Sequence, residues 1–327
     1  MIREGYSFDD VLLVPRYSEV CSRSDVCVDP EVPLSGATIP FIASPMDTIA
    51  GSAMANAINS CGGITVIHRF CSIKEQIKML KEVDSRRWFA VGINDGIERT
   101  KAIVNEVECG GVCIDVAHGH LLNSLLMVEK LKDFMDDEGP GLPIIAGSIA
   151  TKKGFADIQK AGAEGVRVGI GSGSICSTRL MTGVGVPQLT AVMDCAEVKE
   201  EAVLISDGGI RKPADAVKAI AAGADFVMAG GIFAGTEECI DKHTYRGMAS
   251  KEAQVSIGRF ATAEGVSFSV PYKGHVKNIV SDYLGGLRSA MSYTGAHDIR
   301  SFQKLSKFIK ISPSSITENQ TINFNNA

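Results

Sequence analysis

Short apolar runs alternate along this chain with longer stretches that carry apolar residues at helical spacing. Each run is too short for a helix and is largely apolar, which is typical of a parallel strand covered on both faces. Eight strands are predicted, at Pro40–Ser44, Ile64–His68, Phe89–Gly92, Val112–Asp115, Pro143–Gly147, Val166–Gly169, Val203–Asp207 and Phe226–Gly230. The stretches between them predict helices, among them Ile73–Val83, Leu122–Met135 and Pro213–Ala222, whose leading proline suits a first helical turn.

Strands that alternate with helices eight times predict an α/β fold, a single (β/α)8 TIM barrel. An open, doubly wound sheet is the alternative. In a barrel, functional residues follow the carboxyl ends of the strands. The most polar and glycine-rich points of the chain lie there, at Ser44–Asp47, His68–Arg69, Asp115–His120, Gly169–Gly173, Asp207–Gly209 and Gly230–Gly231.

The composition is ordinary for a soluble protein, with 45% hydrophobic and 22% charged residues among 327. This length suits two average domains, but barrels often use as many residues in one. We expect a barrel over residues 1–315 and a flexible polar tail over 316–327. The net charge of −5 argues against nucleic-acid partners. No apolar run reaches the roughly 20 residues of a membrane span.

Cysteine usage and the start of the chain indicate a cytoplasmic protein. The nine cysteines are scattered, odd in number and without a CxxC pair, so we interpret them as reduced thiols rather than a zinc site. The segment Met1–Gly5 lacks the charged and apolar regions of a signal peptide.

The glycine-rich segment Gly169–Gly185 carries the strongest candidate for a nucleophile. We expect it to form neither helix nor strand, because its glycines favour unusual backbone angles and close approach to a ligand. Cys176 lies within it, near Ser174 and Thr178, and a thiol in such a loop is a candidate nucleophile. The alternative is a small buried hydrophobe, which is our interpretation of the other eight cysteines.

Two further glycine pairs end the seventh and eighth predicted strands, at Gly208-Gly209 and Gly230-Gly231. In barrels these two loops frequently bind phosphate through backbone N–H groups and a helix N-terminus. The carboxylate of Asp207 would repel a phosphate, so it suits the hydroxyls of a ribose better. The alternative is that these glycines only permit tight turns.

Taken together, the chain resembles the family of IMP dehydrogenase and GMP reductase over nearly its whole length. The resemblance is carried by Phe8–Pro15, Met46–Thr48, Ala146-Gly147, Val168–Arg179, Gly183–Val192, Ser206–Gly209 and Tyr245–Met248. It implies a tetrameric (β/α)8 barrel that binds potassium at carbonyls of the cysteine loop. It also implies that Cys176 attacks C2 of a purine mononucleotide, beside Thr178 and Glu264.

The resemblance assigns the remaining site residues by position. Those expected to bind the mononucleotide are Ser44, Met46, Ser174, Asp207, Gly208, Gly209, Gly230, Gly231, Gly247, Met248, Ala249, Arg259 and Gly265. Those expected to bind the nicotinamide cofactor are Ser22, Arg23, Arg69, Asp115, Val116, Ala117, Ile170 and Gly171. The carbonyls expected to bind potassium are those of Gly171, Gly173 and Cys176. Arg23, Arg69 and Ser22 are candidates for the 2′-phosphate of NADPH, with NAD as the alternative cofactor.

The two branches of the family share a purine attached to the cysteine but differ in the next step. The dehydrogenase hydrolyses it with an Arg-Tyr pair on a long flap, whereas the reductase expels ammonia and adds hydride. Here only residues 249–263 separate Met248 from Glu264, and Arg259 is followed by Phe260, which has no hydroxyl. The inserted regulatory domain of most dehydrogenases is also missing after the second strand. These features favour NADPH-dependent GMP reduction, with Glu264 and Thr178 handling protons.

Other segments are closer to the dehydrogenases, namely Ser44–Asp47, Ala117–His120, Gly209–Arg211 and Ile311–Pro313. An IMP dehydrogenase without the regulatory domain, and with another base to activate water, is therefore the alternative function. A third hypothesis is a nucleotide sensor that kept the pocket but lost turnover. Against it, binding alone does not require a thiol.

Overall fold

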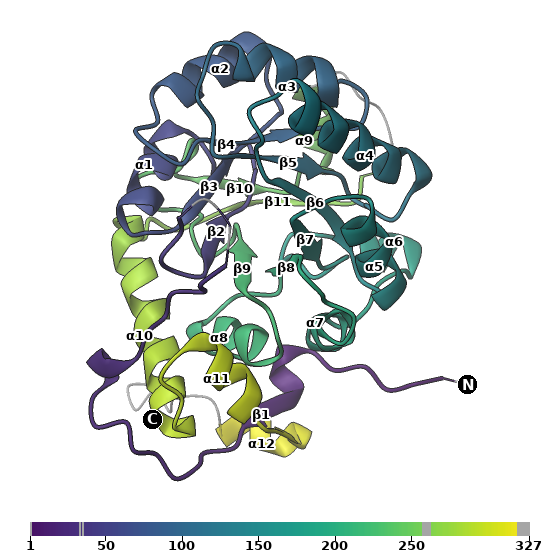
Figure 1. Cartoon of the computed structure of the whole chain (residues 1–327). Coiled ribbons are helices and arrows are strands. Elements are labelled where there is room, and N and C mark those ends of the chain that lie inside the picture. The colour runs from purple at the N-terminus through teal and green to yellow at the C-terminus, as the bar shows by residue number, and fades with distance from the viewer. Residues whose placement is uncertain (1, 33, 35, 257–262, 319–327) are drawn as a thin grey trace.

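In the computed structural model, which describes residues 2–318 except 33, 35 and 257–262, eight parallel strands close into a barrel (Figure 1). They pair in chain order, and the last strand returns to the first through Phe41↔Val227, Ile42↔Met228 and Ala43↔Ala229. The strands are β2 (Phe41–Ala43), β3 (Ile64–Ile67), β4 (Trp88–Val91), β5 (Gly111–Asp115), β6 (Ile144–Ile149), β7 (Gly165–Val168), β8 (Val203–Asp207) and β9 (Phe226–Ala229). The predicted single (β/α)8 barrel is confirmed, and the doubly wound alternative is excluded.

Helices surround the barrel and connect its strands (Figure 1). They are α1 (Ser52–Ser60), α2 (Ile73–Lys81), α3 (Gly96–Val104), α4 (Leu122–Asp137), α5 (Lys152–Lys160), α7 (Gln188–Ala196), α8 (Pro213–Ala221) and α10 (Val276–Thr294). Local sequence fixes where they begin. Ser72 and Glu75 form a reciprocal capping box at the start of α2, and Pro213 occupies the first turn of α8. Only the short stretch from Ile67 to Ile73 connects β3 to α2, so no domain is inserted there.

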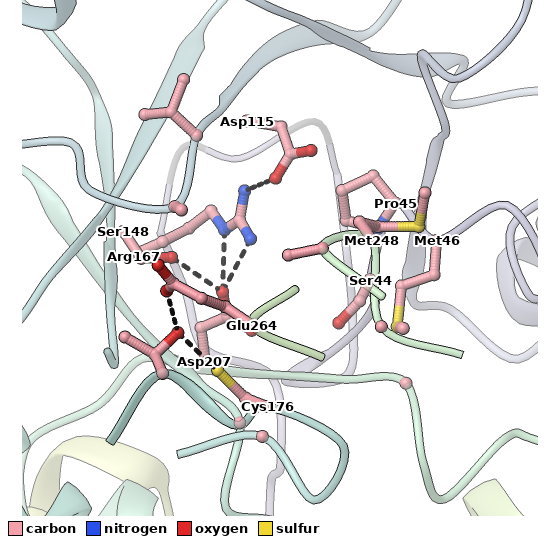
Figure 2. Close-up of a pocket in the computed structure, with 18 of the residues that line it drawn as sticks. Ser44, Pro45, Met46, Asp115, Ser148, Arg167, Cys176, Asp207, Met248 and Glu264 are labelled. Carbon is pink, nitrogen blue, oxygen red and sulfur yellow. Dashed lines mark hydrogen bonds and ion pairs between the residues drawn. The ribbon is translucent and has the colours of Figure 1, made fainter. Parts of the chain in front are cut away.

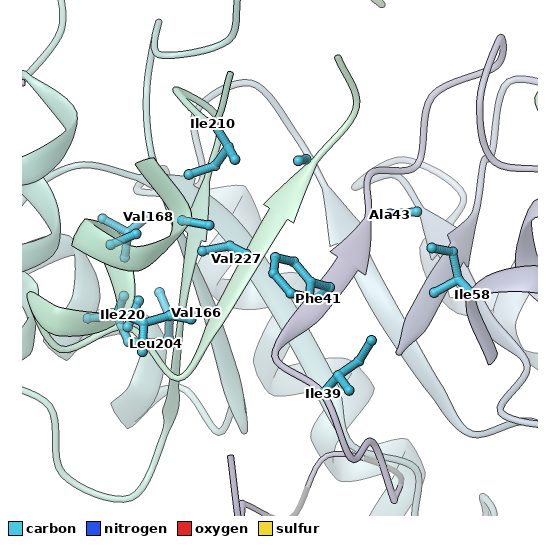
Figure 3. Packing of buried hydrophobic residues seen from close by; sticks show 14 of the residues in the cluster. Ile39, Phe41, Ala43, Ile58, Val166, Val168, Leu204, Ile210, Ile220 and Val227 are labelled. Atoms are coloured by element: carbon cyan, nitrogen blue, oxygen red, sulfur yellow. The ribbon is translucent and has the colours of Figure 1, made fainter. Parts of the chain in front are cut away.

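Side chains alternate along each strand between the barrel interior and the helices. On β4, Trp88 and Ala90 point into the interior cluster, whereas Phe89 and Val91 pack in the outer cluster beneath the helices. Figure 3 shows the outer layer, where Phe41, Val166 and Val227 lie in the same cluster as helix residues such as Ile58 and Ile220. This alternation decides which residues at the strand ends face the barrel axis.

Short elements lie outside the barrel. These are η1 (Phe8–Asp10), β1 (Val11–Leu13), η2 (Arg23–Asp25), α11 (Ile299–Leu305), β12 (Phe308–Lys310) and α12 (Pro313–Glu318). β1 pairs antiparallel with β12, so a segment near the start of the chain lies beside one that follows α11 (Figure 1). Helix α12 crosses the boundary expected at residue 315, and the rest of the expected tail lies outside the described residues.

The longest connection, residues 230–275, runs from β9 to α10. It contains β10 (Thr244–Arg246), α9 (Lys251–Ser256) and β11 (Ser267–Ser269), with β10 and β11 paired antiparallel. The ion pair of Arg246 with Asp47 ties this connection to the loop after β2. It therefore lies against the carboxyl ends of the barrel strands.

Candidate active site

A cavity of about 720 Å³ opens at the carboxyl ends of the barrel strands. Its volume lies in the range of small-molecule sites. It brings together most of the residues predicted for the site, including Ser44, Met46, Arg69, Asp115, Val116, Ala117, Ile170, Gly171, Gly173, Cys176, Thr178, Asp207, Gly208, Gly230, Gly247, Met248, Ala249 and Glu264. Residues from the ends of the barrel strands and from the β9–α10 connection therefore share one space.

Cys176, Thr178 and Glu264 form a hydrogen-bonded chain in this cavity (Figure 2). The thiol Sγ of Cys176 lies 3.2 Å from Oγ1 of Thr178, and that hydroxyl donates to Oε2 of Glu264 at 2.8 Å. A thiol, a hydroxyl and a carboxyl group in one row can pass a proton to or from an atom bound next to the sulfur. The arrangement thus joins a nucleophile to a proton donor.

Backbone hydrogen bonds fix this chain from both sides. Cys176 forms an antiparallel bridge with Gly265, and Ser177 N donates to the Glu264 carbonyl at 3.0 Å. On its other side, Glu264 N donates to the carbonyl of Ala249 at 3.0 Å. The nucleophile loop, the carboxyl group and the segment after β10 are therefore positioned by one another.

The expectation that Gly169–Gly185 would contain no helix is wrong. A short helix, α6 (Thr178–Thr182), follows the thiol and ends at Gly183, whose φ of +70° is the left-handed conformation that glycine accepts most easily. Close approach explains another glycine of the segment. A Cβ atom on Gly169 would lie 2.0 Å from the Asp207 carbonyl oxygen, so a side chain there would separate β7 from β8.

Three charged residues meet inside the barrel at the top layer of the interior (Figure 2). Arg167 of β7 donates from Nη2 to Oδ2 of Asp207 at 2.7 Å and from Nη1 to Oδ1 of Asp115 at 2.8 Å. Ser148 Oγ also donates to Oδ2 of Asp207, at 3.2 Å. Burial disfavours the charge of Arg167, but the neighbouring carboxylates outweigh burial and raise its pKa well above the usual value.

Arg167, Ser148, Tyr245 and Lys273 were missed by the sequence reasoning. A signal for Arg167 existed, because it is the one charged residue in the run Val166–Gly169. Ser148 directly follows the predicted strand that ends at Gly147, at an irregularity in the pairing of β6 with β7. Tyr245 and Lys273 lie in a connection whose fold the pattern did not predict.

A second cavity of about 440 Å³ lies beside Gly231, which follows β9, and Ile210, which follows the glycine pair after β8. It is lined by Ser174, Gly231, Tyr245 and Lys273, and by Pro213 at the first turn of α8. Lys273 Nζ donates to the carbonyls of Gly231 and Ile232 at 3.1 and 3.3 Å. Burial raises the pKa of Tyr245 to about 12, so its hydroxyl remains a donor at neutral pH. This cavity combines a cation with hydroxyl donors, as a phosphate requires.

The remaining predicted residues have separate positions. Gly209, with a φ of +77°, packs beside Gln188 and Phe8, and Gly265 forms the bridge to Cys176. Ser22 and Arg23 lie at η2, where the Arg23 guanidinium stands 5.9 Å from the Tyr293 ring of α10, away from the cavity. Arg259 lies outside the described residues.

The cysteine loop has the donor type that potassium takes, namely backbone carbonyl oxygens. The carbonyl of Gly173 accepts a hydrogen bond from Cys176 N at 3.0 Å. Beside it, Arg179 donates to the carbonyls of Ile170 and Val186. The loop thus offers suitable oxygens, next to a guanidinium that already supplies positive charge. Among the described residues, no cluster of histidine, cysteine and carboxylate side chains could hold a metal, and no helix is long and apolar enough to cross a membrane.

Comparison with known proteins gives a consistent result. A family model described as IMP dehydrogenase / GMP reductase domain matches residues 5–321. A GMP reductase of Klebsiella pneumoniae is 36% identical, covering 93% of this chain and 94% of the relative. An inosine-5′-monophosphate dehydrogenase of Nitrosopumilus maritimus is 32% identical, covering 97% and 98%. The crystal structure of a cysteine-to-alanine GMP reductase from Trypanosoma brucei, in complex with guanosine 5′-monophosphate, superposes with a TM-score of 0.89 at 28% identity, covering 98% of each chain.

Proposed function

The chain belongs to the IMP dehydrogenase and GMP reductase family, and within it we propose that it is a GMP reductase that converts GMP to IMP and ammonia. The observation that carries this proposal is the row formed by Cys176, Thr178 and Glu264. Reduction of GMP needs a nucleophile for C2 and an acid for the departing amine, and this row provides both.

The chemistry follows from the order of these groups. The Cys176 thiolate attacks C2 of the guanine ring and forms a carbon–sulfur bond. The exocyclic amine then takes a proton through Glu264 and Thr178 and leaves as ammonia. NADPH, when bound, supplies the hydride that C2 receives in place of the amine. The carbon–sulfur bond breaks, its electrons return to the sulfur of Cys176, and IMP is released.

The rest of the cavity suits a mononucleotide. Asp207 presents a carboxylate for the ribose hydroxyls, while Gly247 and Met248 flank the base beside Met46. The phosphate occupies the second cavity, where Ser174 and Lys273 provide a hydroxyl and a positive charge. The base, the sugar and the phosphate of the nucleotide thus each have their own partners across the two cavities.

The cofactor end lies on the side of Arg69 and Asp115. Arg69 Nε is 3.2 Å from the Asp115 carbonyl oxygen, and Val116, Ala117, Ile170 and Gly171 line the same space. These residues would hold the nicotinamide, and Arg69 would face the phosphate of NADPH. Potassium binding at Gly171, Gly173 and Cys176, a homotetramer and a cytoplasmic location belong to the same proposal.

IMP dehydrogenase is the second candidate, and one observation favours it. A dehydrogenase relative matches this chain over nearly its full length. Hydrolysis of the cysteine adduct requires a base that activates water, and the sequence between Met248 and Glu264 lacks the Arg-Tyr pair. The dehydrogenase therefore needs a base from elsewhere in the cavity.

One experiment separates these candidates. Purified protein is mixed with GMP and NADPH in potassium buffer, and cofactor absorbance and ammonia are followed; a parallel sample holds IMP and NAD. We expect cofactor oxidation with matching ammonia release, abolished in Cys176→Ala and retained in Cys21→Ala, which changes an exposed cysteine elsewhere. NADH and XMP in the parallel sample alone would establish the dehydrogenase. Binding of GMP or IMP without turnover would establish a sensor.

A further inference from the structure

A continuous line of charged side chains crosses the interior of the cavity. It begins at Arg69, whose Nε is 3.5 Å from Oδ2 of Asp115. From Asp115 it passes through Arg167 to Asp207 (Figure 2). All four residues line the cavity. The guanidinium of Arg167 is the centre of this line, because it contacts both carboxylates.

Side chains along a strand alternate between its two faces, and this alternation places these charged side chains together. Cys113 and Ile205 belong to the interior cluster, so Asp115 and Asp207, two residues further on, face the barrel axis. On β7, Val166 and Val168 pack outward, which turns Arg167 inward between them. Arg167 is only 6% exposed. Movement of the buried guanidinium away from its two carboxylate partners would leave buried charges unpaired, which is strongly destabilising. Arg167 is therefore held in one position.

The hydrogen bonds of Asp207 are unequally divided between its two oxygens. Oδ2 accepts from Nε of Arg167 at 3.0 Å, from its Nη2 at 2.7 Å and from Ser148 Oγ at 3.2 Å. Within the described part of the chain, these are the hydrogen bonds that the carboxylate accepts, and none falls on Oδ1. These three hydrogen bonds hold the Asp207 side chain in one orientation. Oδ2 is fully hydrogen-bonded, and Oδ1 can accept a hydrogen bond from a ligand in the cavity.

We propose that Arg167 is a positioning residue that sets the specificity of the site for ribose by holding Oδ1 of Asp207 toward the sugar hydroxyls. This inference rests on the proposed function, because it takes the ligand to be a ribonucleotide. The fork of arginine is required, since its Nε and Nη2 both donate to Oδ2 and fix the position of that oxygen, which leaves Oδ1 without a donor from the guanidinium. The ammonium of a lysine retains the charge but does not supply this pair of fixed donors.

The test measures equilibrium binding of GMP and of 2′,3′-dideoxy-GMP by calorimetry, without cofactor and therefore without turnover. The proteins are the wild type, Arg167→Lys and Arg167→Met. The matched control is Arg99→Lys, because Arg99 is also buried and donates to Asp95 and Gln76 at 2.8 and 2.9 Å, outside this line. Melting temperature and circular dichroism verify that each variant is folded. If Arg167→Met does not fold, Arg167→Lys decides the question.

We expect wild type and Arg99→Lys to bind GMP about tenfold or more tightly than the dideoxynucleotide, as loss of hydrogen bonds to a charged group predicts. In the Arg167 variants that ratio falls toward one, through weaker GMP binding with the dideoxynucleotide unchanged. An unchanged ratio in Arg167→Lys and Arg167→Met, or an equal loss for both ligands, overturns the inference alone. A wild-type protein that binds neither GMP nor 2′,3′-dideoxy-GMP overturns the proposed function, and the inference with it.

Discussion

Replacing Glu264 with glutamine removes an ionisable group from the active-site row while keeping its length and its ability to accept a hydrogen bond. In the native protein, Oε2 of Glu264 accepts from Thr178 at 2.8 Å, and the Glu264 backbone is held by Ala249 and Ser177. The amide oxygen of glutamine can take the same hydrogen bond, so the loop and the affinity for GMP should be retained. What disappears is the proton for the departing amine.

The expected magnitude follows from the role. A positioned general acid contributes roughly 10²–10⁴ in rate, which corresponds to about 3–5 kcal/mol of the barrier. We therefore expect kcat of Glu264→Gln to fall by that factor, roughly 10²–10⁴, at nearly constant KM. Thr178→Val interrupts the same path, so the double variant should be no slower than the slower single variant.

The assay follows ammonia release and oxidation of the reduced cofactor at saturating GMP. Glu129→Gln, an exposed glutamate on α4, is the matched control and should behave as wild type. The reasoning fails if Glu264→Gln keeps kcat within about threefold of wild type while Cys176→Ala is inactive. It also fails if the losses from Glu264→Gln and Thr178→Val multiply, because independent effects do not share one path.

Four other variants test separate parts of the structure. Lys273→Ala should raise KM for GMP about tenfold but leave guanosine binding unchanged; equal losses would exclude a role toward phosphate. Hydrogen bonds from Arg211 and Lys212 lower the pKa of Asp9 from 3.8 to about 2. The loss of unfolding free energy caused by Asp9→Asn should therefore have its full size above pH 3.8 and should vanish as pH falls through about 2. Urea unfolding of both proteins across this pH range measures it, and a loss that does not depend on pH contradicts this. Gly111→Ala places a Cβ 2.4 Å from the buried Trp88 ring and should cost about 1–3 kcal/mol in urea unfolding. The control is Gly285→Ala on α10, where a Cβ meets open space, and it should stabilise the protein by about 0.5–1 kcal/mol. If Gly111→Ala leaves the unfolding free energy unchanged, the Trp88 ring can move to make room.

The barrel could be predicted because its strands are buried on both faces. Each of the eight apolar runs coincides with a strand to within one or two residues at its ends. The same property hid Arg167. When both faces of a strand are apolar, the pattern does not reveal which residues point inward, so a charged residue in Val166–Gly169 could not be assigned to the interior. Only the pairing of β7 with its neighbours places Arg167 between Asp115 and Asp207.

Other parts of the site depend on contacts between distant segments. Cys176 was recognisable from its own loop, but its hydrogen-bonded chain to Glu264 joins residues far apart in sequence. Tyr245 and Lys273 gain their positions from the pairing of β10 with β11 and from the carbonyls of Gly231 and Ile232. Helix α6 was not predicted because its C-cap residue, Gly183, lies among the other glycines of the segment and was interpreted as part of a loop.

The connection between β9 and α10 separates two tasks of the site along the chain. The last barrel strand ends at Ala229, so the thiol of Cys176 and the carboxylate of Asp207, which we propose for the ribose, both precede that point in the chain. The acid Glu264 arrives only within residues 230–275, which return to the barrel at α10. The proposed nucleophile Cys176 and the proposed acid Glu264 are therefore encoded in consecutive stretches of the chain. Substitutions within residues 230–275 can therefore change the reaction of the cysteine adduct while the barrel strands that precede them keep their sequence.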